Sequence, residues 1–196
     1  KTFDSDCAGL EKEKCDILFF PSVKDIYPDG YGTYVNVENK FTEKLCGAKR
    51  PGHFKGVATV VSMLFNIVLP DRAYFGLKDY QQVLVIKQIV KDLKFPVQIV
   101  PLPTYREKNG LAMSSRNKYL TAQEKEEAAI IYKTLCKGKT IIEQEEKDAL
   151  KILEQLKKDI ALNPNARIDY LELTDSESLE PLALIEKRPV LIAAEV

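Results

Sequence analysis

The chain has 196 residues, enough for one domain of ordinary size or two small ones. Hydrophobic residues make up 45% of it, and 29 basic residues balance 29 acidic ones. This composition excludes a disordered chain and the global basic field that attracts nucleic acid or membrane surfaces. No apolar run reaches the about 18 residues of a membrane span, and no signal segment is expected at the start.

Groups that usually mark metal or nucleophilic sites are sparse. His53 is the one histidine, so a zinc site would lack closely spaced ligands and a Ser-His-Asp triad would have to pass through it. We interpret His53 as a structural residue or a hydrogen-bond donor. The cysteines form no CxxC pair and are expected to be reduced cytosolic thiols: Cys7, Cys15, Cys46 and Cys136.

The N-terminal part of the chain predicts short elements. Residues 15–21 form a continuous apolar run that ends at a proline, which is typical of a buried strand in a parallel sheet. Residues 22–30 predict a loop with a turn at residues 28–30 (PDG). Residues 34–37 alternate and predict a short strand, and residues 41–45 predict one helical turn.

The middle of the chain predicts alternating strands and helices. Residues 57–68 are rich in β-branched side chains, but apolar positions three and four apart favour a buried helix. A strand over 72–75, a helix over 79–93 and a strand over 97–102 follow. This order predicts an α/β fold with a parallel sheet, in which ligands bind beyond the carboxyl ends of the strands.

The C-terminal part changes in character and predicts a small α+β domain that starts near residue 104. Thr121 and Glu124 have the spacing of a capping box at the start of a helix over 121–136, with Gly138 near its end. The further elements predicted are a charged surface helix over 141–162 and strands over 168–173 and 190–194.

A turn between the strand over 72–75 and the helix over 79–93 is the first candidate binding site. Gly76 allows a ligand to approach the backbone closely, and the first N–H groups of the helix attract anions. Lys78 adds a charge suited to phosphate, and Asp79 is expected to cap the helix. Gln82, one turn into the helix, is expected to direct its carboxamide toward the same anion site. The alternative is an ordinary capped turn with a solvated lysine.

Two further loops collect cations and hydrogen-bond donors. Residues 110–117 (GLAMSSRN) suit a polyanion, and the alternative there is a polar loop between domains. Residues 50–56 (RPGHFKG) suit a carboxylate or phosphate clamp, and the alternative is a loop that leads into a helix. Three such loops without a protein nucleophile fit phosphoryl or nucleotidyl transfer, in which positioning and charge stabilisation supply most of the catalysis.

The sequences of these loops carry a resemblance. RPGHFKGVATVV, FGLKDYQQ and GLAMSSRNKYL, in this order and spacing, closely resemble the pantothenate synthetase (pantoate–β-alanine ligase) family. The segment LFFPSVKDIYPDG is also similar to the family's preceding segment. The resemblance runs from about Phe3 to Leu135 and continues more loosely to Ala194.

The resemblance implies a fold and a reaction. It implies a Rossmann-like domain of the HIGH-motif nucleotidyltransferase type in residues 1–104, lacking its N-terminal portion, and a small α+β domain in residues 105–196, usually in a cytoplasmic homodimer. It also implies that ATP, with Mg²⁺ bound through its phosphates and not by protein side chains, converts pantoate to pantoyl adenylate and pyrophosphate. The β-alanine amine then displaces AMP to give pantothenate, a precursor of coenzyme A.

The resemblance also assigns ligands to residues. Gln82 matches the glutamine that holds pantoate, and Arg50 and His53 match a loop beside the active site. Lys78 and Arg116 are expected to neutralise charge on the α-phosphate and the departing pyrophosphate. The positions matched to ATP binding are Gly76, Leu77 (where the family commonly has glutamate), Lys78, Asp79, Tyr105 through its backbone, Met113, Ser114, Ser115 and Arg116. Of these, Ser114 and Ser115 are expected to donate hydrogen bonds to phosphate oxygens.

Two features of the family do not occur in this sequence. They are the HxGH motif that follows the first strand and a second glutamine that binds pantoate. We therefore expect the sequence to be an internal piece of a longer enzyme, poorly active by itself. The alternative is a non-catalytic nucleotide-binding or dimerisation fragment of the same ancestry. Another adenylyltransferase of the superfamily is disfavoured, because Gln82 and the RPGHF segment are features of the ligase.

Overall fold

The computed structural model describes residues 3–186 and 189–195. Its contacts divide the chain into two units that meet at the Thr33–Tyr34 peptide bond. The predicted domain boundary near residue 104 stays a prediction.

The first unit holds two helices, α1 (Phe3–Lys12) and α2 (Val23–Ile26). Ser22 and Asp25 form a capping box at the start of α2, in which each side chain accepts the other's backbone N–H. The predicted turn that follows is confirmed, because the N–H of Tyr31 donates to the carbonyl oxygen of Pro28 at 3.0 Å.

The strand predicted over residues 15–21 is wrong. Residues 15–20 lie in no strand, and the side chains of Ile17 and Phe20 are 84% and 71% exposed. An apolar run forms a buried strand only where a neighbouring strand satisfies its backbone and another layer covers its side chains. Among the residues that the structure describes, residues 15–20 have no strand partner.

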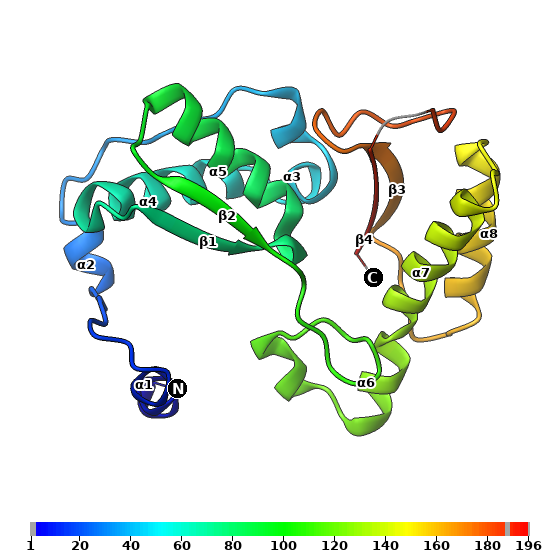
Figure 1. Ribbon diagram of the computed structural model, residues 1–196, viewed down its shortest axis with the longest axis horizontal. Helices are drawn as coiled ribbons and strands as arrows, with labels where there is room; N and C mark the ends of the chain where they lie inside the picture. Colours follow the sequence, from blue (N-terminus) through cyan, green and yellow to red (C-terminus); the bar gives the residue numbers. More distant parts are fainter. Residues whose placement is uncertain (1–2, 187–188, 196) are drawn as a thin grey trace. The chain divides into compact units, whose positions relative to one another are not determined.

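The second unit contains the predicted parallel sheet (Figure 1). Its elements are α4 (His53–Val68), β1 (Arg72–Gly76), the short turn η2 (Leu77–Asp79), α5 (Tyr80–Leu93) and β2 (Gln98–Leu102). β1 and β2 are parallel, with Gly76 opposite Leu102. α5 connects the two strands and packs against both of them and against α4. The two strands and two helices predicted in this region are thus confirmed, with α4 beginning earlier than expected.

The segment before α4 forms no strand, so the strand predicted over residues 34–37 is wrong. The N–H of Val35 donates at 2.9 Å to the hydroxyl of Thr59 on α4, so a side chain takes the place of a neighbouring strand. The helical turn predicted over 41–45 is present as two short helices, η1 (Lys40–Glu43) and α3 (Leu45–Lys49).

The C-terminal part contains helices and an antiparallel pair of strands. These elements are η3 (Ser115–Tyr119), α6 (Ala122–Ala128), α7 (Ile130–Glu143), α8 (Ala149–Ala161), β3 (Tyr170–Asp175) and β4 (Val190–Glu195). The predicted capping box is confirmed, because Thr121 and Glu124 each accept the other's backbone N–H. The two predicted strands are confirmed as β3, which begins at Tyr170, and β4.

The helix boundaries predicted over 121–136 and 141–162 are wrong. The first helix is divided at Ala129 into α6 and α7, and α8 begins only after Asp148, whose carboxylate accepts two backbone N–H groups at its start. Gly138 lies inside α7 instead of ending a helix. A Cβ at Gly138 would lie 2.7 Å from Cδ1 of Ile192 and 2.9 Å from Cδ1 of Leu156, so glycine permits close packing against α8 and β4.

The β3–β4 hairpin lies between two hydrophobic cores. The first core consists of Phe41, Leu45, Phe54, Ala58, Val85, Ile89 and Leu179, and the second of Ala149, Ile152, Leu156, Ile160, Leu171, Leu173 and Ile185. Tyr170, Leu191 and Ala193 of the hairpin pack against the first core. Leu171 and Leu173, together with Ile192, belong to the second. The alternation of side chains along a strand therefore lets one hairpin serve both cores.

All four cysteines are free thiols. Within residues 3–186 and 189–195, none of the helices combines the length and the apolar character that crossing a membrane requires.

Candidate functional site

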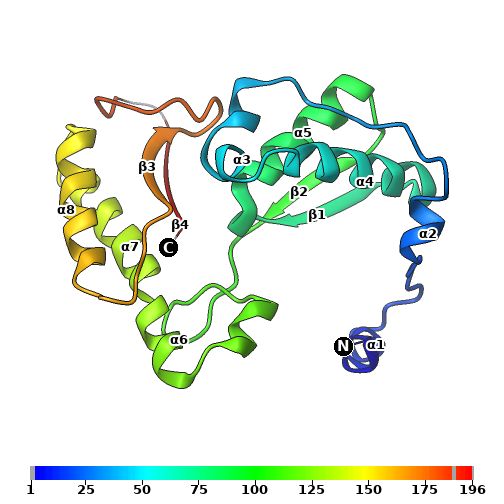
Figure 2. The ribbon, with the colours of Figure 1, turned by 180° about the vertical axis from the view of Figure 1, so that it is seen from behind.

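One predicted loop, and the segment that leads to a second, begin at the carboxyl edge of the parallel sheet. Because Gly76 at the end of β1 is opposite Leu102 at the end of β2, the η2 turn and the segment after residue 102 leave the sheet side by side. Figure 2 shows the chain running from the end of β2 directly into the region that carries α6. This is the edge at which parallel α/β sheets bind ligands.

The η2 turn leaves an open surface over Gly76. The backbone of Gly76 has an ordinary φ of −73°, and no heavy atom lies within 4 Å of the position of a Cβ there. Neither backbone strain nor internal packing therefore requires glycine. Lys78 and Asp79 form an exposed ion pair, with Nζ 3.3 Å from Oδ1.

The predicted helix cap at Asp79 is wrong. Asp79 precedes α5, but its side chain accepts no hydrogen bond from the helix. Capping residues usually have an extended backbone, whereas the 3₁₀ turn before α5 gives Asp79 φ −101° and ψ 57°. The carboxylate pairs with Lys78 instead, so it leaves the first amide groups of α5 uncapped.

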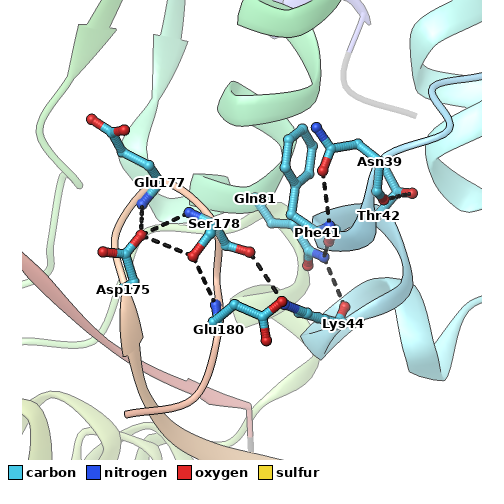
Figure 3. A network of polar contacts seen from close by, with 9 residues as sticks. All are labelled: Asn39, Phe41, Thr42, Lys44, Gln81, Asp175, Glu177, Ser178 and Glu180. Atoms are coloured by element: carbon cyan, nitrogen blue, oxygen red, sulfur yellow. Dashed lines mark hydrogen bonds and ion pairs between the residues drawn. The ribbon is translucent and has the colours of Figure 1, made fainter. Parts of the chain in front are cut away.

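The first turn of α5 directs three successive side chains to different places. The hydroxyl of Tyr80 donates to the carbonyl oxygen of Ser176 at 2.9 Å. Nε2 of Gln81 donates to the carbonyl oxygens of Phe41 and Lys44, both at 2.7 Å (Figure 3). The half-buried side chain of Gln82 hydrogen-bonds with none of the residues that the structure describes. Of these three side chains, it is the one without a hydrogen bond to the described residues.

Lys44 continues this network to the loop after β3. Its Nζ lies 2.6 Å from Oε1 of Glu180 and donates to the carbonyl oxygen of Ser178 at 3.3 Å (Figure 3). Oδ1 of Asp175 accepts from both the N–H and the hydroxyl of Ser178, which shapes the loop locally. The start of α5 is thus attached both to the α3 region and to the C-terminal hairpin.

The second predicted loop forms the 3₁₀ turn η3. The hydroxyl of Ser114 accepts from the N–H of Arg116 at 3.2 Å, which leaves its own proton free to donate. The side chains of Ser115 and Arg116 are exposed, and the guanidinium of Arg116 pairs with none of the described residues. Tyr105 connects this loop to the sheet edge, because its carbonyl oxygen accepts from the N–H of Met113 at 2.9 Å.

The third predicted loop is already engaged within the protein. Nη2 of Arg50 lies 2.6 Å from Oε1 of Glu195 on β4. His53 is the first residue of α4, and its half-buried ring packs edge-on against Phe54 at 5.0 Å. An open cleft of about 720 Å³ lies beside this loop and is lined by Arg50, Pro51 and Gly52 together with residues 36–40 and others of the α3 region. Lys78, Gln82 and residues 113–116 do not line this cleft.

Electrostatics connect the third loop to the η2 turn. Burial raises the pKa of the Cys46 thiol; the Arg50 guanidinium lowers it, and the carboxylates of Glu195 and Asp79 raise it. Arg50 and Asp79 therefore lie within electrostatic reach of the same thiol. In the described part of the chain, no group of three or more histidine, cysteine, aspartate or glutamate side chains is arranged to hold a metal ion.

Comparisons with known proteins agree on one family. The family model described as pantoate-β-alanine ligase matches residues 1–196. A pantothenate synthetase of Moorella thermoacetica is 52% identical over 179 residues, which are 91% of this chain and 63% of the relative. The pantothenate synthetase of Thermosipho africanus is 48% identical over 194 residues, which are 99% of this chain and 69% of the relative. The chain thus spans 63% and 69% of the lengths of these two relatives.

Solved structures agree with the sequence comparisons. The crystal structure of pantothenate synthetase from Thermus thermophilus superposes with a TM-score of 0.93 at 41% identity, over all of this chain and 71% of that one. The pantoate-β-alanine ligase of Francisella tularensis, described as complexed with β-γ ATP and β-alanine, gives a TM-score of 0.76 at 35% identity, over all of this chain and 70% of that one. The predicted fold class, α/β of the HIGH-motif nucleotidyltransferase type, is confirmed.

Proposed function

Since this chain belongs to the pantoate-β-alanine ligase family, we propose that its protein condenses (R)-pantoate with β-alanine in two ATP-driven steps. The pantoate carboxylate attacks the α-phosphorus of Mg·ATP, which gives pantoyl adenylate and releases pyrophosphate. The β-alanine amine then attacks the acyl carbon, loses a proton and displaces AMP, which gives pantothenate. The observation that carries the proposal is the family match over residues 1–196.

Lys78 is proposed to bind the ATP phosphates at the η2 turn. Its ion pair with Asp79 is exposed, so exchanging that partner for phosphate costs little. The open surface over Gly76 and the uncapped start of α5 suit the approach of an anion. Leu77 contributes its backbone to the same turn.

The η3 turn is proposed to hold the phosphates from the other side. The hydroxyl protons of Ser114 and Ser115 donate to phosphate oxygens, and the planar guanidinium of Arg116 binds two oxygens at once. Negative charge develops on the departing pyrophosphate, so these contacts strengthen in the transition state. Tyr105 and Met113, joined by their backbone hydrogen bond, are proposed to contact the nucleoside.

Gln82 is proposed to hold pantoate, because its half-buried carboxamide has no partner among the described residues. Arg50 and His53 are proposed to form a wall of the site. Arg50 contacts substrate only if it exchanges the carboxylate of Glu195, from which it lies 2.6 Å. Mg²⁺ is proposed to enter with ATP, bound to the phosphates.

The site is proposed to work within a cytoplasmic homodimer of two domains that meet near residue 104, as the resemblance of the three loops implies. Light scattering on the purified protein measures the assembly directly. A monomer at micromolar concentration would remove the homodimer from the proposal and leave the reaction untouched.

Pantoate-dependent exchange between ATP and pyrophosphate tests the reaction on the protein as its gene encodes it. Exchange that requires pantoate, but not β-alanine, is the expected result, because the adenylate forms before the amine enters. A folded protein that binds ATP and supports no exchange would overturn the proposal and favour a non-catalytic nucleotide-binding relative.

Replacement of Lys78 tests the assigned site. Lys78→Ala is expected to lower kcat about 100-fold and to weaken ATP binding much less, because the lost contact is strongest in the transition state. Lys91→Ala, which removes an exposed lysine near the other end of α5, is the matched control. Weaker ATP binding with unchanged kcat would contradict the role given to Lys78.

A further inference from the structure

The turn that carries Ser114, Ser115 and Arg116 directly follows a tight hairpin. Residues 105–107 form one arm and residues 111–113 the other. The N–H of Glu107 donates to the carbonyl oxygen of Leu111 at 2.7 Å, and the N–H of Met113 donates to the carbonyl oxygen of Tyr105 at 2.9 Å. Arg106 and Ala112 form an antiparallel bridge between these two bonds. The second arm leads directly into the turn, so the shape of the hairpin determines where the turn begins.

The side chain of Asn117 joins both arms of this hairpin. It is 9% exposed, and its Nδ2 donates to Oε1 of Glu107 at 2.7 Å and to the carbonyl oxygen of Ala112 at 3.0 Å. The N–H of Asn117 also donates to the carbonyl oxygen of Ser114 at 3.0 Å. One buried residue therefore connects the first arm, the second arm and the turn.

The tip of the hairpin is fixed on α7. The guanidinium of Arg106 lies 3.9 Å from the ring centre of Tyr132 and donates to the carbonyl oxygen of Gly110 at 3.1 Å. Gly110 has φ +95°, and a Cβ there would collide with the Tyr132 ring. The arms thus have a rigid support, and Asn117 transmits that support to the turn.

We propose that Asn117, through its hydrogen bond to Glu107, is the positioning residue of the phosphate-binding turn Ser114–Arg116. The proposal rests on the proposed function. The side chains of Ser115 and Arg116 are exposed, and Arg116 has no internal partner in the described part of the chain. Their directions therefore depend on the backbone that Asn117 holds. Asn117 itself is buried, with its Nδ2 engaged by Glu107 and Ala112, so its proposed role is to hold the turn.

Four variants test the proposal by pantoate-dependent exchange. Asn117→Asp sets two carboxylates against each other where a 2.7 Å hydrogen bond now lies. Glu107→Gln keeps a neutral acceptor for Asn117. The double variant pairs a carboxylate at 117 with an amide donor at 107 and so rebuilds the bond in reverse. Asn165→Asp is the matched control, because the exposed Asn165 donates at 2.9 Å to a carboxylate, that of Glu127, in another part of the chain.

Asn117→Asp is expected to lower kcat/KM for ATP about tenfold to a hundredfold, the effect of losing a hydrogen bond to a charged group. KM for pantoate is expected to stay unchanged, since Gln82 lies on a different turn. Glu107→Gln and Asn165→Asp are expected to change kcat/KM by less than about threefold. The double variant is expected to recover part of the loss and not all, because the carbonyl of Ala112 still lacks its donor.

A purely structural role would move different quantities. It would lower the melting temperature of Asn117→Asp and leave kcat/KM for ATP of the folded enzyme unchanged, which would overturn the proposal. Failure of the double variant to recover activity would overturn it as well. If Asn117→Asp does not fold, Glu107→Ala removes the same bond from a half-buried position and is expected to show the ATP-specific loss. If the folded wild-type protein supported no pantoate-dependent exchange between ATP and pyrophosphate, the proposed function itself would be refuted.

Discussion

Leu179 offers a sharp test of how the C-terminal hairpin is attached. It lies in the loop after β3, its side chain is 0% exposed, and it is a member of the first core with residues of α3, α4 and α5. Its φ of +54° is unusual for leucine, so the burial of the side chain has to offset the backbone strain. Replacement by alanine removes the buried side chain and keeps the strained backbone.

The expected loss follows from the burial. Truncating a fully buried leucine to alanine lowers the free energy of unfolding by about 3 kcal/mol, from lost transfer energy and the cavity left behind. Total stabilities are about 5–15 kcal/mol, so this is a large fraction. For a chain of this size, about 3 kcal/mol corresponds to a fall in Tm of about 6–12 °C.

Urea denaturation followed by circular dichroism measures the loss. Leu162→Ala is the matched control, because Leu162 follows α8 and is 82% exposed, and it is expected to change the unfolding free energy by less than about 0.5 kcal/mol. If Leu179→Ala behaved like this control, the loop would not be anchored in the first core, and the reasoning would be refuted.

Two further predictions concern packing and pH. Gly138→Ala is expected to lower the unfolding free energy by about 1–3 kcal/mol in the same urea assay, because its methyl group meets Ile192 and Leu156 at less than 3 Å. A more stable variant would contradict this and show that the packing around α7 adjusts to the added methyl group. Burial, reinforced by the carboxylate of Glu195, raises the pKa of Tyr170 well above its ordinary value. At pH values above about 10 the unfolded chain therefore releases a proton that the folded chain keeps, so the unfolding free energy should fall as pH rises. Tyr170→Phe should remove that part of the fall, and an equal pH dependence in both proteins would contradict the assignment.

The parts of the fold that sequence predicts well are those whose signals are local. The strand–helix–strand unit over residues 72–102 is correct because the apolar stripe of α5 and the flanking strands agree with one another. The failures at residues 15–21 and 34–37 have one cause. Both segments have strand-like side chains, but a strand also requires a backbone partner, which local sequence does not specify.

In the candidate site too, features with a local sequence signal are predictable, and features that depend on distant contacts are not. Residue types and spacing select the Lys78 turn and the Arg116 turn, and the structure shows that the Lys78 turn and the segment leading to the Arg116 turn leave neighbouring strand ends; the binding roles of both turns stay predictions. The hydrogen bonds of Gln81 and Asn117 were not foreseen. Gln81 had a signal, because it is four residues before the buried Val85 on one helix face and a buried amide needs partners. Asn117 had none, since its burial depends on the hairpin folding beneath it.

The position of the β3–β4 hairpin has a consequence for the order in which the chain folds. Lys44 and Ser178, whose hydrogen bond joins the α3 region to the loop after β3, are 134 residues apart in sequence. During synthesis the N-terminal half therefore emerges with a core that still lacks Leu179, Leu191 and Ala193. Such long-range contacts slow folding and leave apolar surface exposed in the meantime. The first core gains its full stability only after the hairpin has emerged from the ribosome, so the earlier half must remain soluble while it is incomplete.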